Sequence, residues 1–172
     1  MNIFEKVDAA FKALQNAEGK TEFAPPVSNE DIERLNNILD AAKLPHLPVD
    51  FMYLLRKFGG CKGPYFEIYG LCGLHGTGNL DDLFLLDDSL YLNRGIDDDE
   101  PKGLLLGCMP RKYTFDLEYK LVYKDGAYHH VEDDRGVMNY FQGLDNIGDF
   151  IIKEIKAAMA DKRRRDVEKW SD

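Results

Sequence analysis

The residues in this sequence that stand out for their chemistry are acidic, and they are concentrated between positions 81 and 100. This stretch holds eight carboxylates and one basic residue, Arg94, so its net charge is −7. Such a run is often a solvated loop, but it also suits a docking surface, because complementary charge speeds encounter with a basic partner. Calcium binding is a weaker interpretation, because residues 97–100 lack the alternating ligands and central glycine of an EF-hand loop. The eight carboxylates are Asp81, Asp82, Asp87, Asp88, Asp97, Asp98, Asp99 and Glu100.

Other residues that bind metals or phosphate form no convincing set. Cys61 and Cys72 are eleven positions apart, which matches no common zinc motif even with His75 nearby. The glycine-rich run 70–78 lacks the Gly-Lys-Ser/Thr ending of a phosphate-binding loop, so we expect an irregular loop at a sheet edge. We therefore predict buried free thiols, no metal and no cofactor.

Catalytic constellations are equally weak. His129 and His130 are adjacent on an expected strand, where successive side chains point to opposite faces, so they cannot serve one site. No nucleophile-elbow motif is present, and no pair of carboxylates is placed by spacing as an acid and a base. We predict no catalytic residues and no enzymatic activity.

Composition sets limits on the class of protein. The chain has 172 residues, of which 44% are hydrophobic and 12% aromatic, enough for one packed domain without disulfides or metals. Its formal net charge of −9 disfavours direct binding to nucleic acid or to an anionic membrane. Three cysteines suit a reducing compartment, no apolar run is long enough to span a bilayer, and the start of the chain does not resemble a signal peptide. We expect a cytoplasmic protein.

Helical patterns occupy the first third of the chain. Apolar spacing predicts a helix over 2–17 that ends near Gly19, followed by a proline-containing linker at 22–27. A capping-box-like start at Ser28 predicts the next helix, which ends at Leu44-Pro45. A third helix follows Pro48, and we expect Gly59-Gly60 to end it by taking the left-handed C-cap conformation.

The middle of the chain shows short strand-like runs at 65–69, 83–86, 104–106, 113–117, 121–124 and 127–131. Asp125-Gly126 predicts a tight hairpin turn between the last two. A final helix is expected over 146–168, with basic residues near its end. The order of elements predicts an α+β fold in which N-terminal helices precede a mostly antiparallel or mixed sheet and a C-terminal helix packs on that sheet. We expect an N-terminal helix and linker (1–27), a core domain (28–160) and a basic tail (161–172).

Two motifs in the first half of the chain resemble a known family. They are Ser28-x-x-x-Ile32-x-x-Leu35 and Leu47-Pro48-x-Asp50-Phe51-x-x-Leu54-Leu55-x-x-Phe58-Gly59-Gly60. The pattern resembles the opening signature of the SUKH superfamily, which unites yeast cell-wall-assembly regulators with bacterial immunity proteins of polymorphic toxin systems. Residues 106–107, 113–117 and 122–123 resemble its central strands, and 147–151 resembles its closing helix. The sequence differs from the family pattern at two places. Phe58 stands where the family frequently has Asn before Gly-Gly, and Cys108-Met109-Pro110-Arg111 stands where it often has a glycine-rich or acidic turn.

The resemblance implies a non-enzymatic protein that binds and neutralises a bacterial toxin of the nuclease or deaminase class. A basic toxin groove would be occupied by the acidic stretch, with aromatic side chains as desolvated anchors. We predict these anchors to be Tyr65, Tyr69 and Tyr91. The alternatives are a regulatory or scaffold module for an endogenous protein partner and, more remotely, a small metal-dependent hydrolase.

Overall fold

The computed structural model describes residues 1–17, 19, 21–41, 43–70, 103–109, 117–134 and 137–168. The predicted strand at 83–86 and nearly all of the predicted strand at 113–117 lie outside these ranges.

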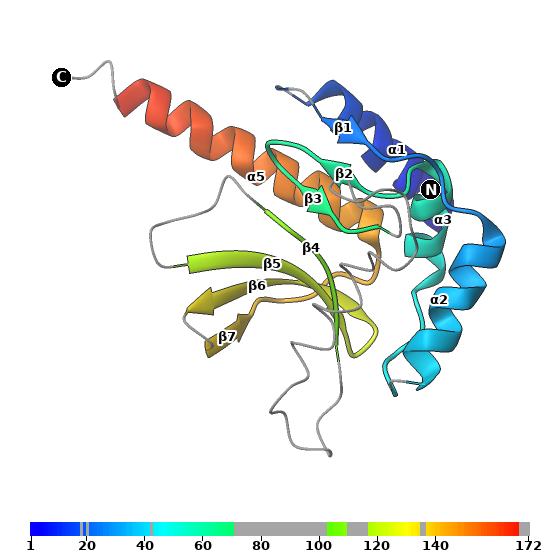
Figure 1. Ribbon diagram of the computed structural model, residues 1–172. Coiled ribbons are helices and arrows are strands. Elements are labelled where there is room, and N and C mark those ends of the chain that lie inside the picture. The colour runs from blue at the N-terminus through cyan, green and yellow to red at the C-terminus, as the bar shows by residue number, and fades with distance from the viewer. Residues whose placement is uncertain are drawn as a thin grey trace.

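The described residues form an α+β fold, as predicted from the order of elements (Figure 1). One antiparallel sheet contains seven strands whose spatial order equals their order in the sequence. The strands are β1 (Glu22–Phe23), β2 (Cys61–Lys62), β3 (Glu67–Ile68), β4 (Leu104–Cys108), β5 (Leu117–Lys124), β6 (Ala127–Asp134) and β7 (Val137–Tyr140). The helices are α1 (Ile3–Asn16), α2 (Asn29–Ala41), α3 (Val49–Lys57) and α5 (Ile147–Glu168).

The hairpin between β5 and β6 is the longest regular pairing in the sheet, running from Leu117 opposite Asp134 to Lys124 opposite Ala127. Its turn residues, Asp125 and Gly126, have φ angles of 53° and 80°. Two successive positive φ values are typical of a type I′ turn, whose twist matches that of the flanking strands. The hairpin predicted from Asp125-Gly126 is confirmed.

Local capping interactions set the start and end of α2. The Ser28 hydroxyl accepts a hydrogen bond from the Asp31 amide at 3.1 Å and donates to the Asp31 carboxylate at 2.7 Å. At the other end, Lys43 takes a φ of 56° and the Leu44 amide donates to the Leu39 carbonyl at 2.8 Å. These bonds satisfy groups that a helix end leaves without intrahelical partners.

The two glycines after α3 serve close packing, and the predicted left-handed C-cap is wrong. The C-cap residue of α3 is Phe58, whose φ of −155° is extended. A Cβ on Gly59 would lie 2.3 Å from the Pro25 carbonyl oxygen, and Gly60 has a φ of 137°. Ala24 bonds to both glycines through its backbone, at 3.1 Å and 2.9 Å. Glycine is needed here because the backbone around 24–25 passes so close.

Residues 1–27 are built into the same domain as the rest of the chain. Val7, Ala10 and Leu14 of α1 are buried and belong to the main hydrophobic core. Contact between α1 and α5 is tight, since a Cβ on Gly148 would lie 2.5 Å from the Lys6 carbonyl carbon. The segment expected to be a plain linker also contributes β1, which pairs with β2. The N-terminal helix therefore completes the core.

The two faces of the sheet pack differently. On one face, Leu104, Leu121 and Tyr128 join the main core together with α5, whose buried residues are Ile147, Phe150, Ile151 and Ile155. The opposite face carries a smaller cluster of Leu105, Val122 and Val131. The predicted packing of the C-terminal helix on the sheet is confirmed, and Figure 1 shows α5 running outward from the centre of the domain.

Candidate functional site

The acidic stretch is inserted between two neighbouring strands. It falls within residues 71–102, which the structure leaves undescribed, so the eight carboxylates and Tyr91 lie outside the described residues. The residues on either side, Gly70 and Gly103, are both buried. Gly70 follows β3 and Gly103 precedes β4, and these strands pair antiparallel, with Ile68 opposite Gly107. Gly70 and Gly103, which flank the undescribed residues 71–102 in the sequence, therefore lie at the same end of the sheet.

Both flanking glycines are tightly packed. A Cβ on Gly70 would lie 1.3 Å from the Gly59 carbonyl oxygen, so only glycine fits without movement of the backbone. At Gly103 the nearest neighbour of a Cβ would be a methyl group of Val122, at 3.1 Å. The same end of the sheet holds the Asp125-Gly126 turn, because Leu104 pairs with Tyr123.

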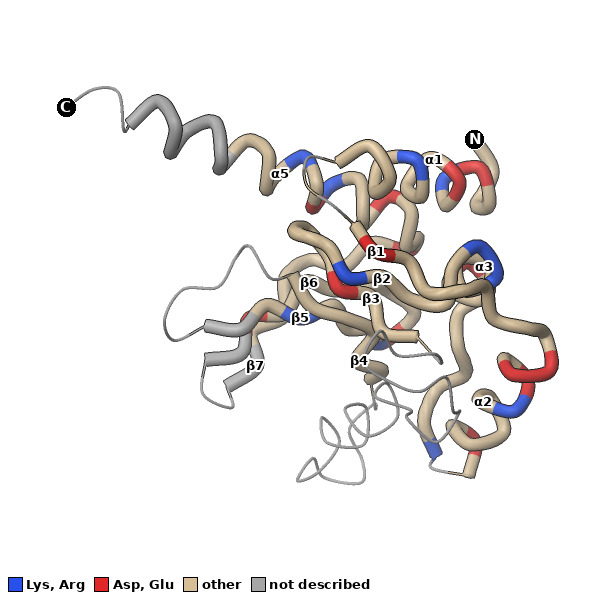
Figure 2. Tube along the Cα trace, turned by 45° about the horizontal axis from the view of Figure 1, so that its top comes forward, with Lys and Arg blue, Asp and Glu red and all other residues tan. Residues whose placement is uncertain are grey.

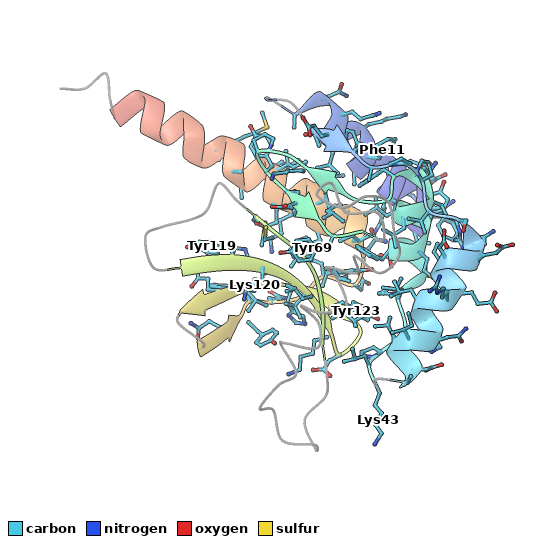
Figure 3. All side chains as sticks on the ribbon, viewed as in Figure 1. Phe11, Lys43, Tyr69, Tyr119, Lys120 and Tyr123 are labelled. Atoms are coloured by element: carbon cyan, nitrogen blue, oxygen red, sulfur yellow. The ribbon has the colours of Figure 1, made fainter. Side chains whose placement is uncertain are left out.

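The predicted aromatic anchors fall in different environments. Tyr65 is 3% exposed and belongs to the main core, so its ring lies inside the domain. Tyr69 is partly buried against both core clusters, and its amide donates to the Leu106 carbonyl at 2.9 Å. Figure 3 labels Tyr69 beside β4, to which this hydrogen bond joins it. Tyr69 directly precedes Gly70 and is partly exposed.

A buried carboxylate, which the sequence showed only as one position of the Leu47-Pro48-x-Asp50 motif, joins three elements. Asp50 is 2% exposed. Its Oδ1 accepts the Tyr128 hydroxyl at 2.7 Å, and its Oδ2 accepts the Ile147 amide at 2.7 Å and the Asn146 side-chain amide at 3.3 Å. Burial, followed by the charge of Asp50 and the hydrogen bond to it, holds the pKa of Tyr128 far above its ordinary value, so the phenol stays protonated as a donor.

These contacts explain the Leu47-Pro48-x-Asp50 motif in physical terms. Pro48 is the N-cap residue of α3 and places Asp50 in the first turn. Asp50 then satisfies the first amide of α5, while the Asn146 side chain accepts the next two, from Gly148 at 2.8 Å and Asp149 at 3.2 Å. The oxygens of Asp50 are thus committed to holding α3, β6 and the start of α5 together. In the sequence, the two helix starts that meet here are marked by Pro48 before α3 and by Asn146 before α5.

A second buried polar contact links β6 to α5. His130 Nδ1 lies 3.4 Å from the Glu154 carboxylate, and Glu154 is 5% exposed. The His130 ring meets the Tyr119 ring with centroids 5.1 Å apart and the Phe141 ring at 5.0 Å. His129 faces the other side, where its two ring nitrogens lie 2.9 Å from the Phe141 carbonyl and 3.3 Å from the Lys124 carbonyl. The predicted separation of the two histidines onto opposite faces is confirmed.

Among the described residues, five large hydrophobic side chains are exposed. Met1, Phe4 and Val49 lie near the starts of α1 and α3, and Phe4 meets the Tyr53 ring at 4.7 Å. Tyr140 and Phe141 lie at the end of β7 and are 41% and 47% exposed.

Two ion pairs join α1 to α3 and α5. Lys57 pairs with Asp8 at 2.7 Å and lies over the Tyr53 ring, and this hydrogen-bonded pair lowers the pKa of Asp8 and raises that of Lys57. Lys6 pairs with Asp149 at 2.6 Å, and that hydrogen bond raises the pKa of Lys6. Charges of both signs are interspersed over the described helices (Figure 2). The net negative charge is thus concentrated in the 81–100 stretch rather than on these helices.

Metal ligation finds no support in the described part of the chain, where no group of three or more His, Cys, Asp or Glu side chains is placed to hold an ion. Cys61 is buried, and burial raises the pKa of its thiol to about 12, so it stays protonated and unreactive near neutral pH. Cys72 and His75 lie outside the described residues.

Comparison with known proteins adds no relative. No protein-family model and no curated protein sequence matches this chain, so the resemblance to the SUKH superfamily remains a prediction from the motifs. None of the described helices combines the length and apolar character that crossing a membrane requires.

Proposed function

We propose that this protein is a non-enzymatic binding domain of the immunity type, which neutralises a basic toxin domain of the nuclease or deaminase class. The observation that carries the proposal is the concentration of negative charge in one part of the sequence. Of the chain's net charge of −9, a charge of −7 falls between residues 81 and 100, in the part of the sequence between β3 and β4. A field concentrated in this way favours a basic partner and speeds its encounter.

The buried polar groups of the described residues support a binding role over a catalytic one. The side chains of Asp50 and Asn146 accept hydrogen bonds from the first backbone amides of α5, and the Glu154 carboxylate lies against the His130 ring. A catalytic carboxylate must reach a reacting group within hydrogen-bonding distance. Asp50 is enclosed by donors of the fold and is 2% exposed, so it acts as a structural acceptor.

Co-expression tests the proposal most directly. The protein is produced in cells together with a candidate toxin domain of the nuclease or deaminase class, chosen from a neighbouring reading frame if one encodes such a domain, and growth is compared with cells that produce the toxin alone. Protection is expected, and the dissociation constant of the purified pair should rise about tenfold or more between ~0.05 M and ~0.3 M salt, because screening weakens long-range attraction. Failure to protect, or affinity that is insensitive to salt, contradicts the proposal.

A matched pair of double variants separates local charge from total charge. Asp97→Asn with Asp98→Asn removes two charges from the acidic stretch, and Glu30→Gln with Glu33→Gln removes two exposed charges from α2. Only the first pair should weaken binding strongly. Equal loss from both pairs would mean that net charge alone matters, and the acidic stretch would lose its assigned role.

The second candidate is a regulatory or scaffold module for an endogenous protein. The many internal contacts between α1, α3 and α5 suit a rigid platform of either kind. This candidate is favoured if a partner of the cell binds stoichiometrically and reversibly while no toxin is neutralised.

A further inference from the structure

The side chain of His129 connects three parts of the sheet. Its Nδ1 lies 2.9 Å from the carbonyl oxygen of Phe141, just after β7, and its Nε2 lies 3.3 Å from the carbonyl oxygen of Lys124, at the end of β5. His129 itself belongs to β6, which lies between these two strands (Figure 1). One imidazole ring therefore joins the end of β5 to the chain that leaves β7.

The chain that leaves β7 pairs irregularly with β6. Tyr140 is opposite Val131, and Leu144 is opposite Tyr128. Two residues of β6 therefore face the three residues 141–143, as in a β-bulge, where the extra residue stays outside the regular ladder. This bulge segment, 141–143, thus depends on contacts other than a continuous set of strand hydrogen bonds.

The His129 ring packs against the backbone of the bulge segment. A Cβ on Gly143 would lie 2.7 Å from Cε1 of His129 and 3.0 Å from its Nε2. Any side chain at position 143 would therefore require the ring to move, and glycine permits the close approach.

Both hydrogen-bond partners of the ring are carbonyl oxygens, which only accept. A neutral imidazole has one N–H donor, and its other nitrogen carries a lone pair that a carbonyl oxygen cannot satisfy. A protonated imidazole donates from both nitrogens. The contacts to Phe141 and Lys124 can therefore be hydrogen bonds at the same time only when both ring nitrogens of His129 carry a proton.

Among the described residues, two titratable side chains face the His129 ring. Lys124 of β5 holds its Nζ 5.1 Å from the centre of the Tyr140 ring. Tyr140 of β7 meets the His129 ring edge-on, with centroids 5.7 Å apart. The β5 residue opposite His129 is Val122, and the sequence of the bulge segment contains no charged residue. The Lys124 charge opposes the added proton, while the two carbonyl oxygens favour it.

We infer that His129 is a pH-sensitive clamp on the bulge segment. In its protonated form the ring bonds to both carbonyls and holds 141–143 against the β5–β6 hairpin, and loss of the proton releases one of the two bonds. Histidine is the side chain whose charge ordinarily changes between about pH 5 and pH 8, so the clamp responds within that range. The bulge segment begins with the exposed Phe141 ring and leads to the start of α5, so the clamp controls how firmly that ring is presented. It acts independently of the toxin-binding function proposed above.

Amide hydrogen exchange, followed by NMR in the full-length protein, tests the clamp. The Phe141 amide bonds to the His130 carbonyl and the Leu144 amide bonds to the Tyr128 carbonyl, so both amides report on the pairing beside β6. After correction for the intrinsic pH dependence of exchange, their protection should be about tenfold greater at pH ~5.5 than at pH ~8. Unchanged protection of these two amides overturns the inference.

The ¹⁵N shifts of the ring nitrogens identify which histidine is responsible. His130 needs this comparison, because its ring meets the Phe141 ring at 5.0 Å on the other face of the sheet. The pH at which protection changes should coincide with the pH at which both nitrogens of His129 become protonated. A change that follows the titration of His130 and not that of His129 overturns the inference.

Two matched variants complete the test. His129→Gln removes the titrating ring but keeps a side chain that can donate and accept, and His46→Gln does the same at an exposed histidine that pairs with Asp40. Only His129→Gln should abolish the pH dependence of the Phe141 and Leu144 amides. The inference is contradicted if His129→Gln retains the tenfold change or if His46→Gln removes it. Circular dichroism shows whether each variant is folded, and the wild-type comparison of the two histidines decides the outcome if one is not.

Discussion

The start of α5 and the end of β7 differ in how completely the fold encloses their side chains. At α5, the first three amides are satisfied by the buried side chains of Asp50 and Asn146. At the end of β7, Tyr140 and Phe141 are 41% and 47% exposed. The difference indicates that the start of α5 is fixed by buried polar contacts of the fold, whereas the end of β7 presents aromatic surface to solvent.

Asp50→Ala should give the largest loss of stability. The substitution removes an acceptor shared by Tyr128, Ile147 and Asn146 and leaves buried donors without it, so we expect the free energy of unfolding to fall by about 3 to 5 kcal/mol. Urea denaturation measures the change. Asp50→Asn keeps the shape and one acceptor oxygen and should lose less. A loss below ~1 kcal/mol for the alanine variant would show that the region is not held by this carboxylate.

Tyr128→Phe should have the next largest effect, about 1 to 2 kcal/mol at neutral pH, because it removes one of the donors to Asp50 while keeping the ring. The pKa of Tyr128 is raised in the folded state by burial and by the nearby carboxylate. A raised folded pKa means that the stabilisation is complete below the unfolded pKa of ~10 and declines as the pH rises above it.

The alkaline part of the stability curve therefore distinguishes the variant. The wild-type protein should lose stability above pH ~10 more steeply than Tyr128→Phe, so the difference between them should shrink there. Denaturation curves from pH 7 to pH 11 provide the measurement. Parallel curves would mean that Tyr128 ionises as easily in the folded state as in the unfolded chain.

The sequence predicted those features that depend on neighbouring residues. The Ser28 cap involves a residue three positions away, and the β5–β6 turn depends on the positive φ values that Asp125 and Gly126 accept. In contrast, the Asp50 network joins residues 78 and 97 positions apart, and no periodicity in the sequence reports such a pairing. β1 and β2, with two residues each, are too short to show alternation.

The candidate site was predictable only as a concentration of charge. Acidity at 81–100 is visible in the sequence, but the position of the flanking residues Gly70 and Gly103 at the same end of the sheet depends on the β3–β4 pairing. Exposure is also a property of the fold. Tyr65, predicted as an anchor, is buried, whereas Tyr140 and Phe141, which the sequence reading did not select, are exposed at the sheet edge.

Asp8→Asn should have a small effect and extends the comparison to the surface of the helices. The pKa of Asp8 is lowered, first by its hydrogen bond to Lys57, so its stabilisation is present above an ordinary Asp pKa of ~3.9 and is lost as the pH falls below that value. Because the Asp8 side chain is 43% exposed, solvent screens the pair, and we expect a loss of less than ~1 kcal/mol at pH 7. The variant and the wild type should converge near pH 2. A difference that persists at pH 2 would point to packing rather than charge.

Phe141→Ser should have the smallest effect on stability and therefore gives the sharpest test of the comparison. The Phe141 ring is 47% exposed and meets the His130 ring at 5.0 Å, so its removal should change the free energy of unfolding by no more than about 0.5 kcal/mol. Urea denaturation at pH 7 measures this change beside that of Asp50→Ala. A loss of ~2 kcal/mol or more would make the β7 edge part of the fold's own stabilising core. A negligible loss would show that the exposed ring is dispensable for folding, in contrast to the buried carboxylate of Asp50.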